Sequence, residues 1–248
     1  MPTKMTIGII GGMGPQATNR LCEMISGMTL ATCDQDHIPV LSFNNSAIPN
    51  RVAAILEDGT SPLPELIRTA TILEAAGADF LLMPCNTAHF FIDALQAAVS
   101  IQIVDMLQST VQFIHSNYPQ LETIGVIAST PTLECQLYGD LLQRNGYKTL
   151  VPSSLVQEQV MNAIFSESGI KAGFTDKPRE VLIASAEHLI DMGAQAIIAG
   201  CTEVSLVLKA GDFDAPLIDP LAILAALAVE RASGYALDLI PQVTCGAS

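Results

Sequence analysis

The chain has 248 residues, which is enough for one large domain or two domains of ordinary size. Half of the residues are hydrophobic, and 11 basic residues against 25 acidic ones give a formal net charge of −14. Such a charge repels nucleic acid and anionic membranes, so we expect neither as a partner. No apolar run approaches the roughly 18 residues that a membrane span needs.

The first fifteen residues, MPTKMTIGIIGGMGP, have a short apolar part that soon becomes glycine-rich, so we expect no signal peptide. The expected location is therefore cytoplasmic. The six cysteines have no dense spacing. In a reducing compartment they are expected to be free thiols rather than a disulfide framework.

Short apolar runs alternate with longer amphipathic stretches, which is the pattern of a parallel α/β protein. The runs are typical of strands that are buried on both faces. Strands are predicted at 6–11, 39–44, 79–84, 101–105, 123–128, 148–153, 195–200 and 215–219. Helical spacing is found in LPELIRTATILEAAG (63–77), PREVLIASAEHLIDMG (178–193) and the apolar tail AILAALAVERASGYALDLI (222–240).

The second half of the chain repeats the first. The matching pairs are TIGIIGGMGP at 6 with TIGVIASTPT at 123, GADFLLMPCNT at 77 with GAQAIIAGCTE at 193, and IVDMLQ at 103 with LIDPLA at 217. The order is the same and the offsets, 117, 116 and 114, are nearly equal. We predict an α/β protein with two similar parallel-sheet domains, related by a pseudo-two-fold axis and with the active site between them. The first comprises residues 1–115 plus 220–248, and the second 116–219.

Two cysteines occupy equivalent places in this repeat. Cys85 and Cys201 each follow a predicted buried strand, and each precedes a residue expected to cap a helix, Asn86 or Thr202. Ligands bind at the carboxyl ends of strands in open α/β sheets, and a helix N-terminus is expected to lower the pKa of each thiol. Thiols on opposite sides of one ligand suit the interconversion of enantiomers, because one removes the α-proton and the other delivers a proton to the opposite face. This chemistry needs no cofactor and no metal.

Three motifs together resemble the aspartate racemase branch of the aspartate/glutamate racemase superfamily: IGIIGGMGPQAT (7–18), PCNTAH (84–89) and GCTE (200–203). The resemblance runs from residue 6 to about residue 225. It implies cofactor-independent racemisation by two cysteines across two α/β domains, and a homodimer is expected from it. The acid/base pair would then be Cys85 and Cys201.

The resemblance also implies where the substrate binds. Side chains and helix-start amides at Asn86, Thr87 and Thr202 would hold the α-carboxylate. Arg51, which follows IPN, and Lys171, in the segment GIKAG, would hold the distal carboxylate, and a guanidinium can do so bidentately. Met13, in the first strand–helix turn, would be a further contact. Glycine-rich flanks make the Lys171 segment a candidate mobile loop that closes over the substrate.

Substrate choice stays open among related amino acids. Glutamate racemases typically carry GCTH, whereas this chain has Glu203 at the last position, and its first strand ends in GGMGP rather than a serine-containing turn. Both differences favour aspartate over glutamate as the substrate. A broad-specificity amino-acid racemase or a glutamate racemase on the same scaffold remains an alternative.

Other classes of function fit parts of the sequence. GGMGPQA fits a dinucleotide-binding turn, but the second strand ends in Asn44 rather than in the acid that would bind a ribose. Cys85 and His89 are four residues apart, which permits a cysteine hydrolase, and with Cys201 they could form a zinc site. An acidic amino-acid binding protein without catalysis would use Arg51 and Lys171 and would need neither thiol.

Overall fold

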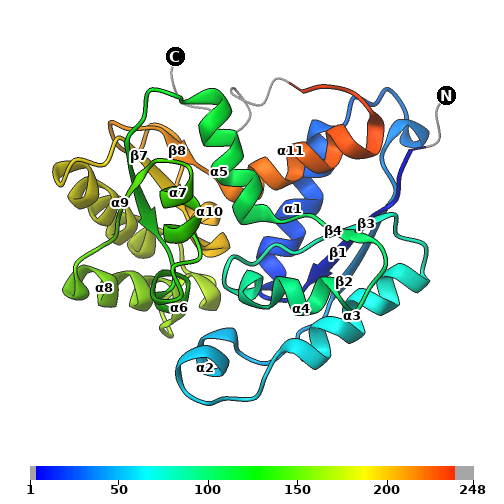
Figure 1. The fold of residues 1–248 in the computed structure, drawn as a ribbon, viewed down its shortest axis with the longest axis horizontal. Coiled ribbons are helices and arrows are strands. Elements are labelled where there is room, and N and C mark those ends of the chain that lie inside the picture. The colour runs from blue at the N-terminus through cyan, green and yellow to red at the C-terminus, as the bar shows by residue number, and fades with distance from the viewer. Residues whose placement is uncertain (1–3, 238–248) are drawn as a thin grey trace. The chain divides into compact units, whose positions relative to one another are not determined.

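The protein is described from a computed structural model, which covers residues 4–237. The chain divides into two units, one built from residues 4–106 and 221–237, the other from residues 107–220. Each unit has a sheet with helices around it (Figure 1). The sequence-based boundaries at residues 115 and 219 stay a prediction.

The first unit contains a four-stranded parallel sheet in the order β2-β1-β3-β4. Its strands are β1 (Ile7–Gly11), β2 (Val40–Asn44), β3 (Phe80–Leu82) and β4 (Gln102–Ile103). Its helices are α1 (Pro15–Met28), α2 (Arg51–Leu56), α3 (Leu63–Ala75), α4 (Ile92–Gln96) and α11 (Pro220–Ser233), with 3-10 helices η1 (Asp34–Asp36) and η2 (Thr87–Phe91).

Both faces of this sheet are covered, which explains the continuous apolar runs in the sequence. Successive side chains of a strand point to opposite faces. Ile9 accordingly packs in a cluster with residues of α1 and α11, whereas Ile10 packs in another cluster with residues of α3. The central strand β1 is buried along its whole length.

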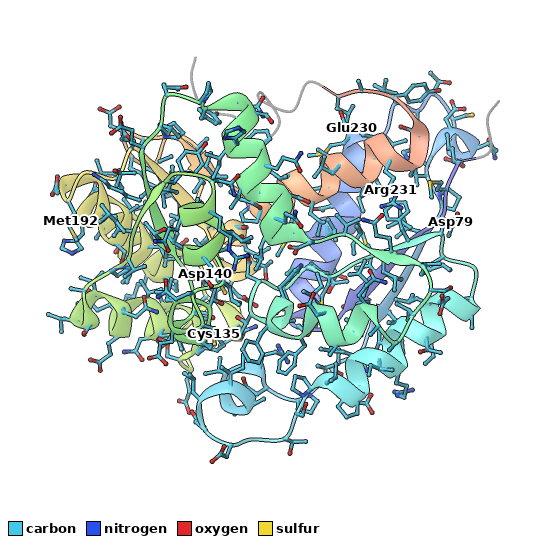
Figure 2. The ribbon with its side chains drawn as sticks, viewed as in Figure 1. Asp79, Cys135, Asp140, Met192, Glu230 and Arg231 are labelled. Atoms are coloured by element: carbon cyan, nitrogen blue, oxygen red, sulfur yellow. The ribbon has the colours of Figure 1, made fainter. Side chains whose placement is uncertain are left out.

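Helix α11 packs in the first unit, beside α1. Arg231 is on α11 (Figure 2). Its guanidinium carbon lies 4.6 Å from the centroid of the Phe80 ring, and its Nη1 donates a hydrogen bond to Gln102 Oε1 at 2.8 Å. The predicted helical stretch to residue 240 is too long. Helix α11 ends at Ser233 because Gly234 has a φ of 75°, the left-handed conformation that terminates helices. Residues 238–240 lie outside the described part.

The second unit has the sheet order β6-β5-β7-β8, again parallel throughout. Its strands are β5 (Thr123–Ile127), β6 (Lys148–Leu150), β7 (Ala196–Ala199) and β8 (Leu217–Ile218). Helix α5 (Met106–Asn117) starts at the boundary, and α6 (Thr130–Glu134), α7 (Gly139–Arg144), α8 (Ser154–Phe165), η3 (Ile170–Ala172), α9 (Asp176–Asp191) and α10 (Thr202–Val207) follow.

The two sheets have the same strand order when β1 to β4 are matched with β5 to β8 in sequence. This is the match that the internal repeat predicts, and two similar parallel-sheet α/β units confirm the predicted fold class. Within residues 4–237, no helix has both the length and the hydropathy required to cross a membrane.

Candidate active site

The turn after β1 brings the backbone of two loops close together. Gly12 has a φ of 99°, and a Cβ at this position would lie 2.4 Å from the carbonyl oxygen of Asn45. The Gly12 N–H donates to Thr18 Oγ1 at 3.1 Å. Both the left-handed conformation and the close approach therefore require glycine at this position.

We expect Gly12→Ala to lower the free energy of unfolding by at least about 2 kcal/mol, because it adds backbone strain and a clash with Asn45. Gly27→Ala is the matched control. Gly27 lies in α1, where a Cβ added to it would meet no other part of the structure within 4 Å. Alanine at this position should therefore raise the free energy of unfolding by up to about 1 kcal/mol. Urea denaturation of both variants measures the difference. Equal effects would contradict the assigned turn geometry.

Arg51 begins α2 and is held by backbone carbonyls. Its Nη1 donates to the oxygens of Ile48 at 3.2 Å and Pro49 at 2.7 Å, and its Nη2 donates to Met13 O at 3.3 Å. Among residues 4–237 no carboxylate forms an ion pair with Arg51. The guanidinium is therefore oriented by neutral groups and keeps its charge available to an anion. Met13 reaches this site through its carbonyl, because its side chain is buried in the core.

Cys85 follows β3 by three residues and packs in the same buried cluster as Met13. Asn86 and Thr87 come next and are also buried. The segment differs from the predicted α-helix start, since η2 is a five-residue 3-10 helix, and the side chain of Asn86 does not cap it. The predicted capping role of Asn86 is therefore wrong, whereas its role toward a substrate stays a prediction.

His89 is fixed by two backbone groups. Its Nε2 accepts from the Met106 N–H at 3.2 Å, so its Nδ1 carries the proton and donates to the Cys85 carbonyl oxygen at 2.8 Å. Both ring nitrogens are thus engaged, and neither contacts the Cys85 thiol. This arrangement argues against His89 as the base of a cysteine hydrolase or as a zinc ligand. Its function is to hold the chain at Cys85.

The pKa of His89 should affect folding. Burial lowers this pKa from its ordinary 6.5, opposed by the charge of Asp105 and the bond to the Cys85 carbonyl. Above pH about 6.5 the ring is neutral in both states; below it the unfolded chain binds a proton that the folded chain does not. The free energy of unfolding should therefore fall further in the wild type than in His89→Gln between pH 6.5 and 5.5, by up to about 1 kcal/mol. Parallel pH profiles in urea denaturation would contradict this.

In the second unit, Cys201 occupies the N-cap position of α10 without a side-chain capping bond, and Thr202 is the first residue of that helix, so the predicted capping role of Thr202 is wrong. Cys201 is 7% exposed, and its Sγ donates to Glu203 Oε2 at 3.0 Å. The predicted lowering of its pKa is wrong. Burial first, and then the charge and hydrogen bond of Glu203, raise the pKa of Cys201 well above its usual value, and Lys171 only partly opposes them. A helix of six residues does not outweigh these effects.

Lys171 lies on η3 and forms an ion pair with Glu203 through Oε1. Its ammonium also lies 5.5 Å from the centroid of the Phe165 ring. The neighbouring Ile170 is buried in the core of the second unit, so the Lys171 segment is anchored in the structure rather than forming an open loop. Cys201, Glu203 and Lys171 therefore form one connected group.

Comparison with known proteins relates this chain to racemases. The Asp/Glu/hydantoin racemase family matches residues 10–228. The chain belongs to this family. The broad-specificity amino-acid racemase RacX of Bacillus subtilis (strain 168) is 26% identical over 236 residues, which cover 92% of this chain and 99% of RacX.

Solved structures of similar proteins agree with the family assignment. An aspartate racemase of Picrophilus torridus has a TM-score of 0.83 and 27% identity, covering 92% of this chain and 94% of its own. An aspartate racemase homologue of Pyrococcus horikoshii OT3 shares the fold, with a TM-score of 0.73 and 23% identity over 92% of this chain and 99% of its own. The predicted family is thereby confirmed, and family and relatives support an isomerase of the racemase type.

Within this racemase-family fold, the predicted residues form two groups. Met13 and Arg51 are in contact in the first unit, where Cys85 shares the cluster of Met13. Cys201 and Lys171 are linked in the second unit by Glu203. Sequence reasoning did not assign Glu203 to the site. The available signal in the sequence was a charged residue in the first turn after a predicted buried strand. In the structure, Glu203 is 4% exposed.

Proposed function

We propose that this protein interconverts L- and D-aspartate by proton transfer at the α-carbon between two thiols, Cys85 and Cys201. The observation that carries the proposal is their equivalence. Each follows the third strand of a parallel sheet, β3 or β7, in sheets of the same strand order, in a chain of a racemase family. Enantiomers have equal free energy, so a catalyst with two matched groups serves both directions.

In the proposed reaction, one cysteine acts as thiolate and removes the α-proton. The other, as thiol, delivers its proton to the opposite face and becomes the thiolate. The proposed contacts of the α-carboxylate are Asn86, Thr87 and Thr202. Hydrogen bonds to that carboxylate would stabilise the charge that develops when the α-proton leaves.

The proposed contacts of the distal carboxylate are Arg51 and Lys171. Arg51 suits this role because backbone carbonyls orient it and no carboxylate among the described residues pairs with it. Lys171 is paired with Glu203, but an ammonium has three donors, so it can bind a substrate oxygen as well. Met13 would line the same end of the substrate.

The proposal also covers the cellular compartment, the oligomeric state and the binding partner. We propose a cytoplasmic homodimer, because thiol catalysis needs a reducing compartment and because the motifs resemble those of dimeric racemases. A small acidic amino acid is the proposed partner, and the net charge of −14 disfavours nucleic acid. Broad specificity remains the second candidate, favoured by the similarity to RacX, which is described as a broad-specificity amino-acid racemase.

The test is a substrate panel. Purified protein with a reductant and no cofactor is incubated with the L- and D-forms of aspartate, glutamate, alanine and lysine, and chirality is followed by chromatography. We expect the highest kcat/KM for aspartate, with equal values for its two enantiomers. Comparable rates across the panel would replace the aspartate proposal with broad specificity. Binding of aspartate without inversion would indicate an amino-acid binding protein.

A further inference from the structure

The two cysteines are equivalent in the repeat but differ in their surroundings. The thiol of Cys201 is hydrogen-bonded to one carboxylate oxygen of Glu203, and the other oxygen of that carboxylate binds Lys171. Within the part of the chain that the structure describes, the thiol of Cys85 has no carboxylate partner. The proposed acid/base pair is therefore asymmetric, and Glu203 touches one of its two reacting sulfurs.

Charge limits what Cys201 can do in this setting. A thiolate 3.0 Å from the Glu203 carboxylate would place two negative charges side by side with little access to water, because both side chains are buried. Lys171 is one cation and can balance one negative charge. The pair of Cys201 and Glu203 therefore holds one shared proton far more easily than it loses that proton and carries two negative charges.

We propose that Glu203 is the proton acceptor that ionises Cys201. This inference rests on the proposed racemase function. The S–H bond of Cys201 breaks with its electron pair left on sulfur, and the proton forms an O–H bond on Oε2 of Glu203. The pair carries one negative charge before and after this transfer, so Lys171 balances it in both states.

The same assignment closes the catalytic cycle. Glu203 keeps the proton during turnover, and its O–H donates to the thiolate. The thiolate takes the α-proton of the substrate and becomes a thiol, and Cys85 delivers its own proton to the carbanion and becomes the thiolate. The negative charge has then moved from Cys201 to Cys85, and the enzyme is ready for the opposite enantiomer.

The pH profile tests this role. In the wild type the proton moves within the pair, so kcat/KM for L-aspartate should be nearly flat around neutral pH. In Glu203→Gln the proton must leave to solvent, so log kcat/KM should rise by about one per pH unit up to the pKa of Cys201. The charged groups that act on Cys201 are Glu203 on α10 and Lys171 on η3. A uniform loss of activity with an unchanged profile would overturn the proposal.

Alkylation of Cys201 by iodoacetamide tests the coupling without turnover. Peptide mass spectrometry should find that the alkylation rate of Cys201 changes little between about pH 6 and 8 in the wild type, because Glu203 takes the thiol proton, and rises about tenfold per pH unit in Glu203→Gln, where the proton must leave to solvent. Cys85 is the internal reference in the same digest. Parallel pH profiles of Cys201 alkylation in the two proteins would overturn the proposal. No turnover in the wild type, by contrast, would overturn the racemase function itself.

Two further variants keep the test decisive. Breaking a buried ion pair can prevent folding, so the double variant Glu203→Gln/Lys171→Met replaces both charges with neutral groups and should also show the rising profile. The matched control is Asp212→Asn, which removes the carboxylate of a different ion pair in the second unit, with Arg179. It should leave both the profile and Cys201 alkylation as in the wild type. A shift in this control equal to that of Glu203→Gln would overturn the proposal.

Discussion

Replacing either Cys85 or Cys201 by serine should lower kcat/KM for both enantiomers of aspartate by at least about a thousandfold. Removal of one acid/base group costs up to about 10⁴-fold, and serine is far too weak an acid to replace a thiol. Because the equilibrium constant between enantiomers is one, the loss must be the same in both directions. Chiral chromatography at several substrate concentrations measures it.

A third cysteine provides the control for these variants. Cys33 is exposed at the N-cap of η1, where a serine hydroxyl can replace the thiol, so Cys33→Ser should retain wild-type kcat and KM. Circular dichroism and thermal unfolding check that all three variants are folded. A folded Cys85→Ser or Cys201→Ser variant with near wild-type activity would eliminate the two-thiol mechanism.

Replacing Arg51 by methionine should specifically weaken the binding of dicarboxylates. Hydrogen bonds between a charged donor and a carboxylate contribute about 1.5–3 kcal/mol each, so KM for aspartate should rise by about 10- to 100-fold. Arg51→Lys should recover only part of this, because an ammonium lacks the planar fork that the carbonyls of Pro49 and Met13 orient.

Two inhibitors that differ by one carboxylate separate this effect from a general disturbance of the loop. Succinate has the distal carboxylate and butyrate lacks it. In Arg51→Met we expect the inhibition constant of succinate to rise by about the same factor as KM, and that of butyrate to change little. Equal weakening of both inhibitors would mean that Arg51 shapes the loop and does not bind the distal carboxylate.

The main features of the fold could be predicted from the sequence. Each predicted strand corresponds to an observed one, because strands buried on both faces leave continuous apolar runs such as that of Ile7–Gly11. The internal repeat predicted two similar α/β halves, and the two sheets have the same strand order. Strand ends were less accurate: β3 stops at Leu82, two residues before the end of its predicted run, and β4 has two residues.

The surroundings of the predicted site residues could not be predicted in the same way. Strand-end position located Cys201, but the partner of its thiol depends on the side-chain direction of Glu203 and on the place of Lys171, 32 residues away in the chain. Likewise, spacing alone allowed His89 to serve as a base. Its bonds to the backbone of Cys85 and Met106 emerge only when the chain is folded.

The most direct test of the two-thiol account follows hydrogen at the α-carbon. The protein is incubated with L-aspartate in D2O. The enantiomers are separated at low conversion, and mass spectrometry measures the deuterium content of each. Because the delivered proton comes from a solvent-exchanged thiol, the D-aspartate should carry α-deuterium while the remaining L-aspartate keeps protium. D-aspartate that retains the original protium, or no inversion at all, would contradict the account.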